Sequence, residues 1–344
     1  MKQAVHADAM GFLSPYREPP VIEGRLALQV VCTTSAPSYP KYPGGKVSLD
    51  RIREGHEKFV SVLETQPLVR IVRGREDLDA AGSVKVVCGL RCPPEDGDPR
   101  RAARQIRRQG NRMTNLSGFD GDHPYGAGFA RPDIGLTENG REFVRACADC
   151  GMIGDVAHMS HRCIMDTLEL IARERLSMPL MASHVGCFSV YPHGQNLPDE
   201  IIRAIFEMGG FLGIIGLTPL LSEKDDTEAP FFQHLAYALE MARKVGKGWV
   251  GFGSDAVYRD RTIDEARQQM RALLDRFPNR RKAFDDIDAR IPGFPSRWIT
   301  SGTRIPELID QGMKQRGFDA EVIHGVLGNN LLHFLRAALP DAGD

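Results

Sequence analysis

Short apolar runs alternate with amphipathic segments along the whole chain. Eight of these runs are continuous enough to be strands buried on both faces. We expect them at residues 2–7, 26–32, 84–90, 111–116, 152–158, 179–184, 211–216 and 249–254. Between and after them, apolar residues recur at the spacing of amphipathic helices, at 137–151, 161–175, 198–208, 231–245 and 262–276.

This alternation predicts an α/β protein with a parallel sheet, because parallel strands need long crossover connections that are usually helices. Eight such units match a closed (β/α)8 barrel of the TIM type, which has no exposed sheet edge. An open doubly wound sheet is the alternative, but no GxGxxG loop follows the first strand. We expect a single barrel domain over residues 1–344, with an insertion at about 256–300 and further C-terminal helices over 304–339.

Histidine and aspartate residues stand at the carboxyl ends of four of the predicted strands. They are His6 with Asp8, His158, His184 and Asp255. A buried strand tolerates an imidazole or a carboxylate only where that group is paired or ligates an ion. The carboxyl ends of barrel strands meet at the active site, so we expect these five side chains to form one site. Imidazole with carboxylate suits zinc or a similar divalent ion, whose bound water attacks amides at neutral pH.

The other histidines divide into two groups. His123 and His193 lie in loops rich in glycine and proline, after the fourth and sixth strands. Such loops overhang the barrel mouth, so these two are candidate substrate contacts, with a purely structural role as the open alternative. The rest fall in helical patterns and are expected to be packing or surface residues: His56, His234, His324 and His333.

Longer segments extend this pattern over nearly the whole chain. They are HAD at 6–8, GLTENGREFVRACADCGMIGDVAHMS at 135–160, ASH at 182–184, QNLPDEIIRAIFEMGGFLGI at 195–214, WVGFGSD at 249–255 and VLGNNLLHFLRA at 326–337. In these segments the chain resembles the membrane (renal) dipeptidase family of zinc metallopeptidases. The resemblance implies a (β/α)8 barrel, a homodimer and a two-zinc centre that hydrolyses dipeptides with a free carboxyl terminus. It implies that His6 and Asp8 bind one metal, that His158 and His184 bind the second, and that Asp255 handles the catalytic proton.

Three positions depart from the family's pattern. Arg91 stands where the resemblance implies a bridging glutamate at the end of the third strand, and a permanent cation cannot ligate zinc. Glu95 is near in sequence, but it reaches the site only if the loop after Pro93 folds back. Gly118 replaces a substrate-polarising histidine, and Gln195 replaces an arginine that binds the substrate carboxylate.

From these features we expect a metal-dependent hydrolase of a dipeptide or small amide, with one zinc ion rather than two and an altered specificity. Arg91 is expected to pair with Asp8 or Asp255, or to face an anionic substrate or oxyanion as the positive group. A buried ion pair that fills a vacated metal site is the alternative. Gln195 joins His123 and His193 as a candidate substrate contact. Two other functions stay open: a tailoring lyase or isomerase on the same barrel, and a binding protein that has lost its metal.

Composition narrows the classes of partner. The 344-residue chain has a formal net charge of −1, which gives no electrostatic reason to expect nucleic acid or an anionic membrane. No run resembles a signal peptide or a membrane span, so we expect a cytoplasmic protein that acts on a small molecule or dipeptide. The seven cysteines are an odd number, which favours free thiols over a disulfide framework.

Overall fold

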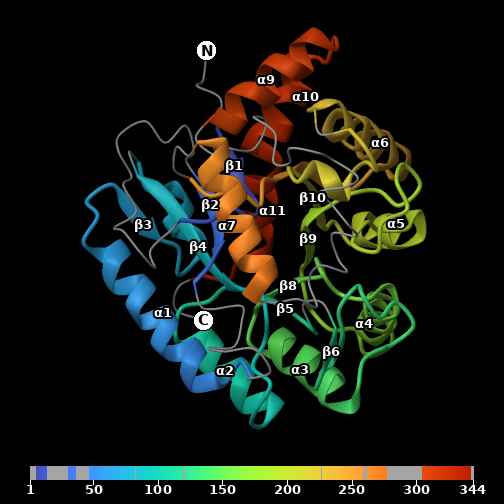
Figure 1. Ribbon diagram of the computed structural model, residues 1–344. Helices are drawn as coiled ribbons and strands as arrows, with labels where there is room; N and C mark the ends of the chain where they lie inside the picture. Colours follow the sequence, from blue (N-terminus) through green and yellow to red (C-terminus); the bar gives the residue numbers. More distant parts are fainter. Residues whose placement is uncertain are drawn as a thin grey trace.

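Eight parallel strands form a nearly closed barrel surrounded by helices (Figure 1). The computed structural model describes residues 5–13, 30–35, 46–81, 83–118, 121–225, 227–258, 262–276 and 304–341. The strands follow one another around the barrel in chain order: β1 (Ala7–Asp8), β2 (Val30–Thr34), β4 (Val84–Leu90), β5 (Met113–Asn115), β8 (Ile153–Asp155), β9 (Leu180–Val185), β10 (Phe211–Ile215) and β11 (Trp249–Gly253). The predicted (β/α)8 fold is therefore confirmed.

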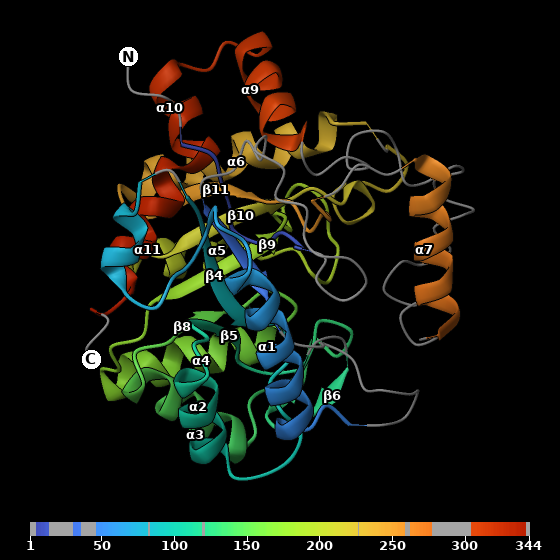
Figure 2. The same ribbon diagram turned by 90° about the vertical axis from the view of Figure 1, so that its left-hand side faces the viewer.

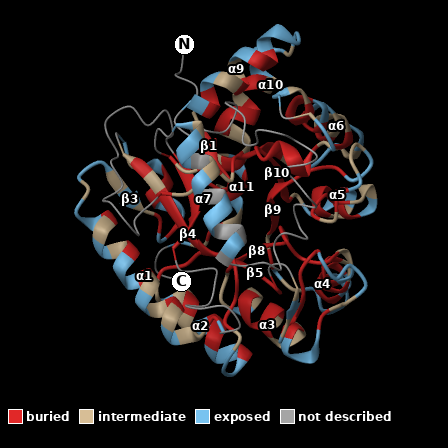
Figure 3. Ribbon diagram, viewed as in Figure 1, coloured by how far each residue is buried: buried red, intermediate tan, exposed pale blue. Residues whose placement is uncertain are grey.

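The barrel strands are buried along almost their whole length (Figure 3). This burial follows from the composition of the strands, because helices cover their outer face and side chains fill the interior. The barrel closes through the residues that follow β1. The amide of Ala9 donates to the carbonyl of Phe252, and the amide of Asp255 donates to that of Met10. The closure brings the N-terminal segment and the end of β11 together at the carboxyl end of the barrel.

Outer helices begin where side chains cap them. Thr137 accepts from the amide of Gly140 at the start of α3, and Ser160 accepts from the amide of Cys163 at the start of α4. No helix in the described ranges combines the length and apolar character of a membrane span. The helices up to the insertion are α1 (Leu49–Glu64), α2 (Pro99–Arg108), α3 (Glu138–Asp149), α4 (His161–Glu174), α5 (Asp199–Glu207), α6 (Ala229–Val245) and α7 (Ile263–Arg276).

The C-terminal helices expected over 304–339 are three α-helices in the structure. They are α9 (Ile305–Gln315), α10 (Ala320–His324) and α11 (Asn330–Ala338), and a π-helical segment, Gly325–Asn329, separates the last two. A Cβ at Gly328 would lie 2.5 Å from the carbonyl oxygen of Val5, so this glycine lets the segment lie directly against the chain entering β1. Leu331, Phe334 and Leu335 of α11 then pack with Phe211 at the start of β10.

Several boundaries differ from the prediction. The strand expected at 152–158 ends at Asp155, so His158 lies in the turn beyond it. A short strand, β3 (Val69–Ile71), and a hairpin of β6 (Asp122–His123) and β7 (Gly126–Ala127) were not predicted. Within the insertion expected at 256–300 lies α7, which stands apart from the ring of helices (Figure 2). The parts of the predictions that fall at 2–4, 26–29, 259–261 and 277–300 lie outside the described residues.

Candidate active site

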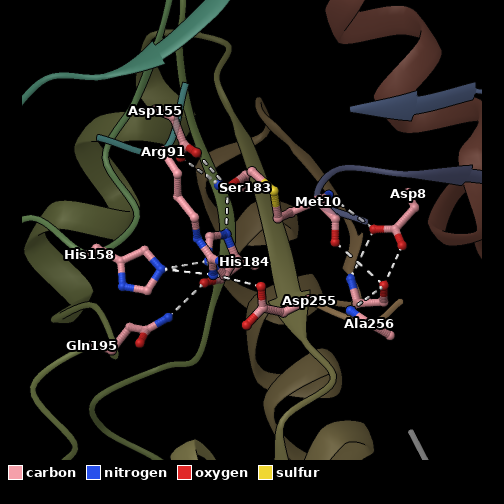
Figure 4. Close-up of polar contacts among 11 residues, drawn as sticks. Asp8, Met10, Arg91, Asp155, His158, Ser183, His184, Gln195, Asp255 and Ala256 are labelled. Atoms are coloured by element: carbon pink, nitrogen blue, oxygen red, sulfur yellow. Dashed lines mark hydrogen bonds and ion pairs between the residues drawn. The ribbon is translucent and has the colours of Figure 1, made fainter. Parts of the chain in front are cut away.

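Arg91 is the centre of the site. It directly follows β4, and its side chain is only 8% exposed. Its Nη2 atom lies 2.6 Å from Oδ1 of Asp255, 2.8 Å from Nε2 of His184 and 3.1 Å from Nε2 of His158 (Figure 4). The ring of Phe12 lies on the guanidinium, with 5.0 Å between the ring centroid and Cζ. Three predicted site residues therefore converge on one nitrogen of the arginine that departs from the family's pattern.

Two residues of this cluster have a strained backbone. His158 has a φ of 69° and Asp255 a φ of 53°, in the left-handed region that side chains with a Cβ rarely adopt. The described part of the chain contains one other non-glycine residue with positive φ, Arg175, which ends α4. Such strain persists where the surrounding structure fixes a residue, and it is frequent at functional sites.

A directed chain of hydrogen bonds holds His184. Arginine only donates, so Nε2 of His184 accepts from Arg91 and its proton is on Nδ1. Nδ1 lies 2.6 Å from Oγ of Ser183, which in turn lies 2.6 Å from Oδ2 of Asp155. The hydrogen bonds therefore run from Arg91 through His184 and Ser183 to Asp155. Burial and the nearby guanidinium lower the pKa of His184 well below its ordinary value, which keeps the ring neutral.

His158 completes the cluster from the turn after β8. Its Nε2 lies 2.8 Å from Nε2 of His184. Nη2 of Arg91, which can only donate, lies 3.1 Å from the same Nε2 of His158. One guanidinium nitrogen therefore contacts the ring nitrogens of both histidines.

Asp155 and Ser183 were not predicted as site residues. Burial raises the pKa of Asp155, while hydrogen bonds from Ser183 and Ala157 oppose that shift. The signal that selected the other candidates was present here too, because Asp155 is a carboxylate at the end of the buried strand β8. A serine beside a histidine at a strand end carries no comparable signal.

Asp8 lies in a separate group of contacts (Figure 4). It is fully buried, and its Oδ1 accepts from the amides of Met10 at 3.0 Å and Ser254 at 2.9 Å. Its Oδ2 accepts from the hydroxyls of Ser254 and Tyr258. Burial raises the pKa of this carboxyl, and the four hydrogen bonds oppose the shift. Asp8 therefore joins β1 to the end of β11 and stabilises the closure of the barrel.

Glu95 does not turn back toward Arg91. Its Oε1 accepts from the amide of Val47 at 2.8 Å, and its own amide donates to the carbonyl of Val47 at 2.8 Å. These two bonds fix Glu95 to the segment that precedes α1. The carboxylate that might have replaced the bridging glutamate is therefore used elsewhere.

His123 occupies the space left by Gly118. A Cβ at Gly118 would lie 2.7 Å from Cβ of His123 and 2.9 Å from the carbonyl oxygen of Gly121, so a larger residue requires the hairpin to move. Nδ1 of His123 accepts from the amide of Tyr125, and Nε2 lies 3.3 Å from the carbonyl of Pro93. Both ring nitrogens thus bond to the backbone, and the contact to Pro93 supports the loop that follows Arg91.

Gln195 and His193 adjoin the cluster from the loop after β9. Nε2 of Gln195 lies 3.3 Å from the carbonyl oxygen of His184. The ring of Phe129 lies 5.8 Å from the ring of His193 and 6.0 Å from that of His158, measured between centroids. These side chains form the wall of the site beside the two central histidines. Elsewhere His56 and His234 are buried in α1 and α6, which confirms their predicted packing role.

We expect the free energy of unfolding to fall as the pH is lowered from about 6.5 to about 4. Burial lowers the pKa values of His123 and His234 from 6.5 to about 4. Within this range the unfolded chain binds more protons than the folded chain, so protonation favours unfolding by up to about 3 kcal/mol for each histidine. Urea unfolding of the native chain and of His123→Gln at several pH values measures this effect. The variant should show a shallower pH dependence, and an unchanged slope would contradict the assignment to His123.

Comparison with known proteins adds a family and a fold. The family model for membrane dipeptidase (peptidase family M19) matches residues 21–288. The dipeptidase tcpJ of Claviceps purpurea is 24% identical over 202 residues, which are 59% of this chain and 38% of that protein. The chain therefore spans much less than half the length of this curated relative.

Solved structures match over almost the whole chain. An amidohydrolase from Pseudomonas aeruginosa has a TM-score of 0.74 and 17% identity, with 99% of this chain and 97% of that chain covered. A metallo peptidase from Rhodobacter sphaeroides, liganded with a phosphinate mimic of the dipeptide L-Ala-D-Ala, has a TM-score of 0.70 and 17% identity, with 97% and 99% covered. At this level of identity the likeness shows the fold alone.

The match to the family implies a divalent metal ion. The contacts of the site residues decide whether they could bind one. Zinc needs about four bare lone pairs at about 2.0–2.3 Å. Nε2 of His184 accepts from Arg91, Nε2 of His158 lies 3.1 Å from the same guanidinium nitrogen, and both oxygens of Asp8 accept from the protein. Among the residues that the structure describes, no three His, Cys, Asp or Glu side chains are grouped to hold one ion.

The predicted zinc ligands, His6, Asp8, His158 and His184, are therefore not assembled around one position. His6 precedes β1, and its carbonyl accepts from the amide of Val30. The physical reason for the difference is the guanidinium of Arg91, which stands between the two ring nitrogens and Asp255. In this arrangement the residues do not fit a zinc ion.

Proposed function

Since the chain belongs to the membrane dipeptidase family, we propose that it is a hydrolase that cleaves a dipeptide or a small peptide-like amide. The match over residues 21–288 supports this class of reaction, as does the name of the Claviceps purpurea relative. The proposed site lies at the carboxyl end of the barrel strands, where (β/α)8 enzymes carry out their chemistry.

The convergence of Arg91, Asp255 and His184 carries the proposal. Asp255 accepts a proton from water as the water oxygen attacks the carbonyl carbon of the substrate. Arg91 donates to the carbonyl oxygen, which gains negative charge in the tetrahedral intermediate. Collapse of that intermediate breaks the C–N bond, and the proton held by Asp255 passes to the leaving amine. His184 keeps the guanidinium oriented by accepting from Nη2.

A panel of dipeptides and acylated amino acids tests the activity. Purified chain should release free amino acids, measured by mass spectrometry, and Asp255→Asn should lower the rate by about 10²-fold or more. Asp50→Asn is the matched control, because Asp50 is an exposed carboxylate on α1 with 82% of its side chain accessible. Correctly folded native chain that cleaves no member of the panel would contradict the proposal.

We propose an altered specificity because Gln195 offers a neutral amide where the resemblance implies an arginine. A neutral amide cannot form the bidentate ion pair by which arginine selects a carboxylate. A dipeptide and its C-terminal amide should therefore differ in kcat/KM by less than about tenfold. Gln195→Arg should raise the preference for the free acid. A preference of more than about a hundredfold in the native chain would show that another group binds the carboxylate.

A further inference from the structure

We infer that the guanidinium of Arg91 takes the place of the metal ion in this protein, and that the chain binds no zinc at this site. The inference rests on the proposed function for the role of the site, but it is carried by the contacts of a single atom. Nη2 of Arg91 lies within 3.1 Å of the ring nitrogens of His158 and His184 and 2.6 Å from Asp255. These are three of the groups that the family resemblance assigns to the metal centre and its proton transfer.

Electrostatics opposes a zinc ion next to this side chain. A dication and a guanidinium about 4 Å apart repel each other strongly at a buried position, where little water screens the two charges. Arg91 is 8% exposed and lies under the ring of Phe12, so the guanidinium is packed in place. Asp255 contacts the guanidinium and balances the charge of the arginine.

The Nε2 atoms of His158 and His184 both face the guanidinium of Arg91. A histidine that ligates zinc through Nε2 must present a bare lone pair there. Ser183 and Asp155 keep the proton of His184 on Nδ1, and the lone pair on Nε2 accepts from Arg91. Nε2 of His158 lies 3.1 Å from the same guanidinium nitrogen. Ser183 and Asp155 are thus positioning residues that hold the lone pair of His184 toward Arg91.

Asp8, the carboxylate among the predicted zinc ligands, uses both of its oxygens in hydrogen bonds that stabilise the fold. It accepts from the amides of Met10 and Ser254 and from the hydroxyls of Ser254 and Tyr258. Binding an ion would require it to give up bonds that close the barrel. The arrangement therefore has one cation, supplied by the chain, in place of a binuclear metal centre.

Metal analysis tests the inference without any need for turnover. The full chain, purified without chelator, should contain only trace zinc and should show no heat of binding with zinc chloride in calorimetry. Arg91→Ala removes the cation and leaves His158, His184 and Asp255 facing the vacated space, so it should bind about one zinc per chain. His184→Ala in that background should abolish the binding. Arg91→Lys is the matched control: it keeps a positive charge and should remain free of zinc.

If Arg91→Ala does not fold, measurements on the native chain still test the inference. One or two equivalents of zinc on the native chain, released by His184→Ala, would overturn the inference. Nitrogen-15 spectra of labelled histidine should show His184 protonated on Nδ1; Ser183→Ala should lose this preference and Ser183→Thr should keep it. A native chain that binds no zinc and hydrolyses nothing contradicts the proposed function but supports the inference. Dipeptide hydrolysis by a zinc-loaded native chain contradicts the inference alone.

Discussion

Replacing Asp255 by alanine is expected to lower the free energy of unfolding by about 3–5 kcal/mol and to reduce hydrolysis by at least about 10²-fold. Asp255 is 10% exposed, and its Oδ1 atom lies 2.6 Å from Nη2 of Arg91, which is 8% exposed. The variant leaves a buried guanidinium without its counter-charge, and it removes the group proposed to accept the proton. Urea unfolding and the rate of amino-acid release measure the two effects separately.

A double variant separates stability from activity. Arg91→Met with Asp255→Leu replaces both partners of the ion pair by apolar side chains, a change that is often neutral or stabilising in buried pairs. We expect the double variant to recover most of the lost stability while hydrolysis stays at the reduced rate. If the double variant hydrolyses the substrate at the native rate, the ion pair fills space and has no part in turnover.

The barrel was predictable from the sequence because strands and helices are recognised from short local patterns of apolar residues. Apolar runs mark the strands whose two faces are covered, and the order of strands and helices selects the topology. The exact ends of strands were less predictable, since apolar character continues past the last ladder hydrogen bond. The segment 152–158 shows this: β8 ends at Asp155, and His158 reaches the site from a strained turn.

The site was predictable in its residues but not in their contacts. Arg91, His158, His184 and Asp255 do meet, as expected for residues at the same end of a barrel. The sequence could not show that one nitrogen of Arg91 would contact all three partners. Such distances depend on how four separate strands pack together, and the order of residues along the chain does not reveal that packing.

The contacts of Asp8 were even less predictable from the sequence. The pair His6 and Asp8 has the spacing of two ligands on one face of a strand, and that spacing supported a metal site. The partners of Asp8 are Ser254 and Tyr258, which are far away in sequence and near only because the barrel closes. A buried carboxylate at a strand end is evidence for a specific partner, and the closure of the fold decides which partner it has.

Asp8→Ala is expected to lower the free energy of unfolding by about 3–5 kcal/mol, because it leaves several buried donors without an acceptor. The amides of Met10 and Ser254 lose a carboxylate oxygen, as do the hydroxyls of Ser254 and Tyr258. Asp8→Asn keeps one acceptor oxygen and should cost less. Urea unfolding at neutral pH gives both values, with metal content measured on the same preparations.

A double-mutant cycle with Tyr258→Phe identifies the cause of the loss. Alone, Tyr258→Phe should cost about 1 kcal/mol, because it removes one donor to Asp8. In the Asp8→Ala background the same change removes a hydroxyl that has lost its acceptor, so it should be neutral or stabilising, with a coupling of about 0.5–3 kcal/mol. Strictly additive effects together with zinc lost from Asp8→Ala would identify Asp8 as a metal ligand. Coupling without any change in metal content would instead assign Asp8 to the closure of the barrel, which leaves Arg91 as the cation of the site.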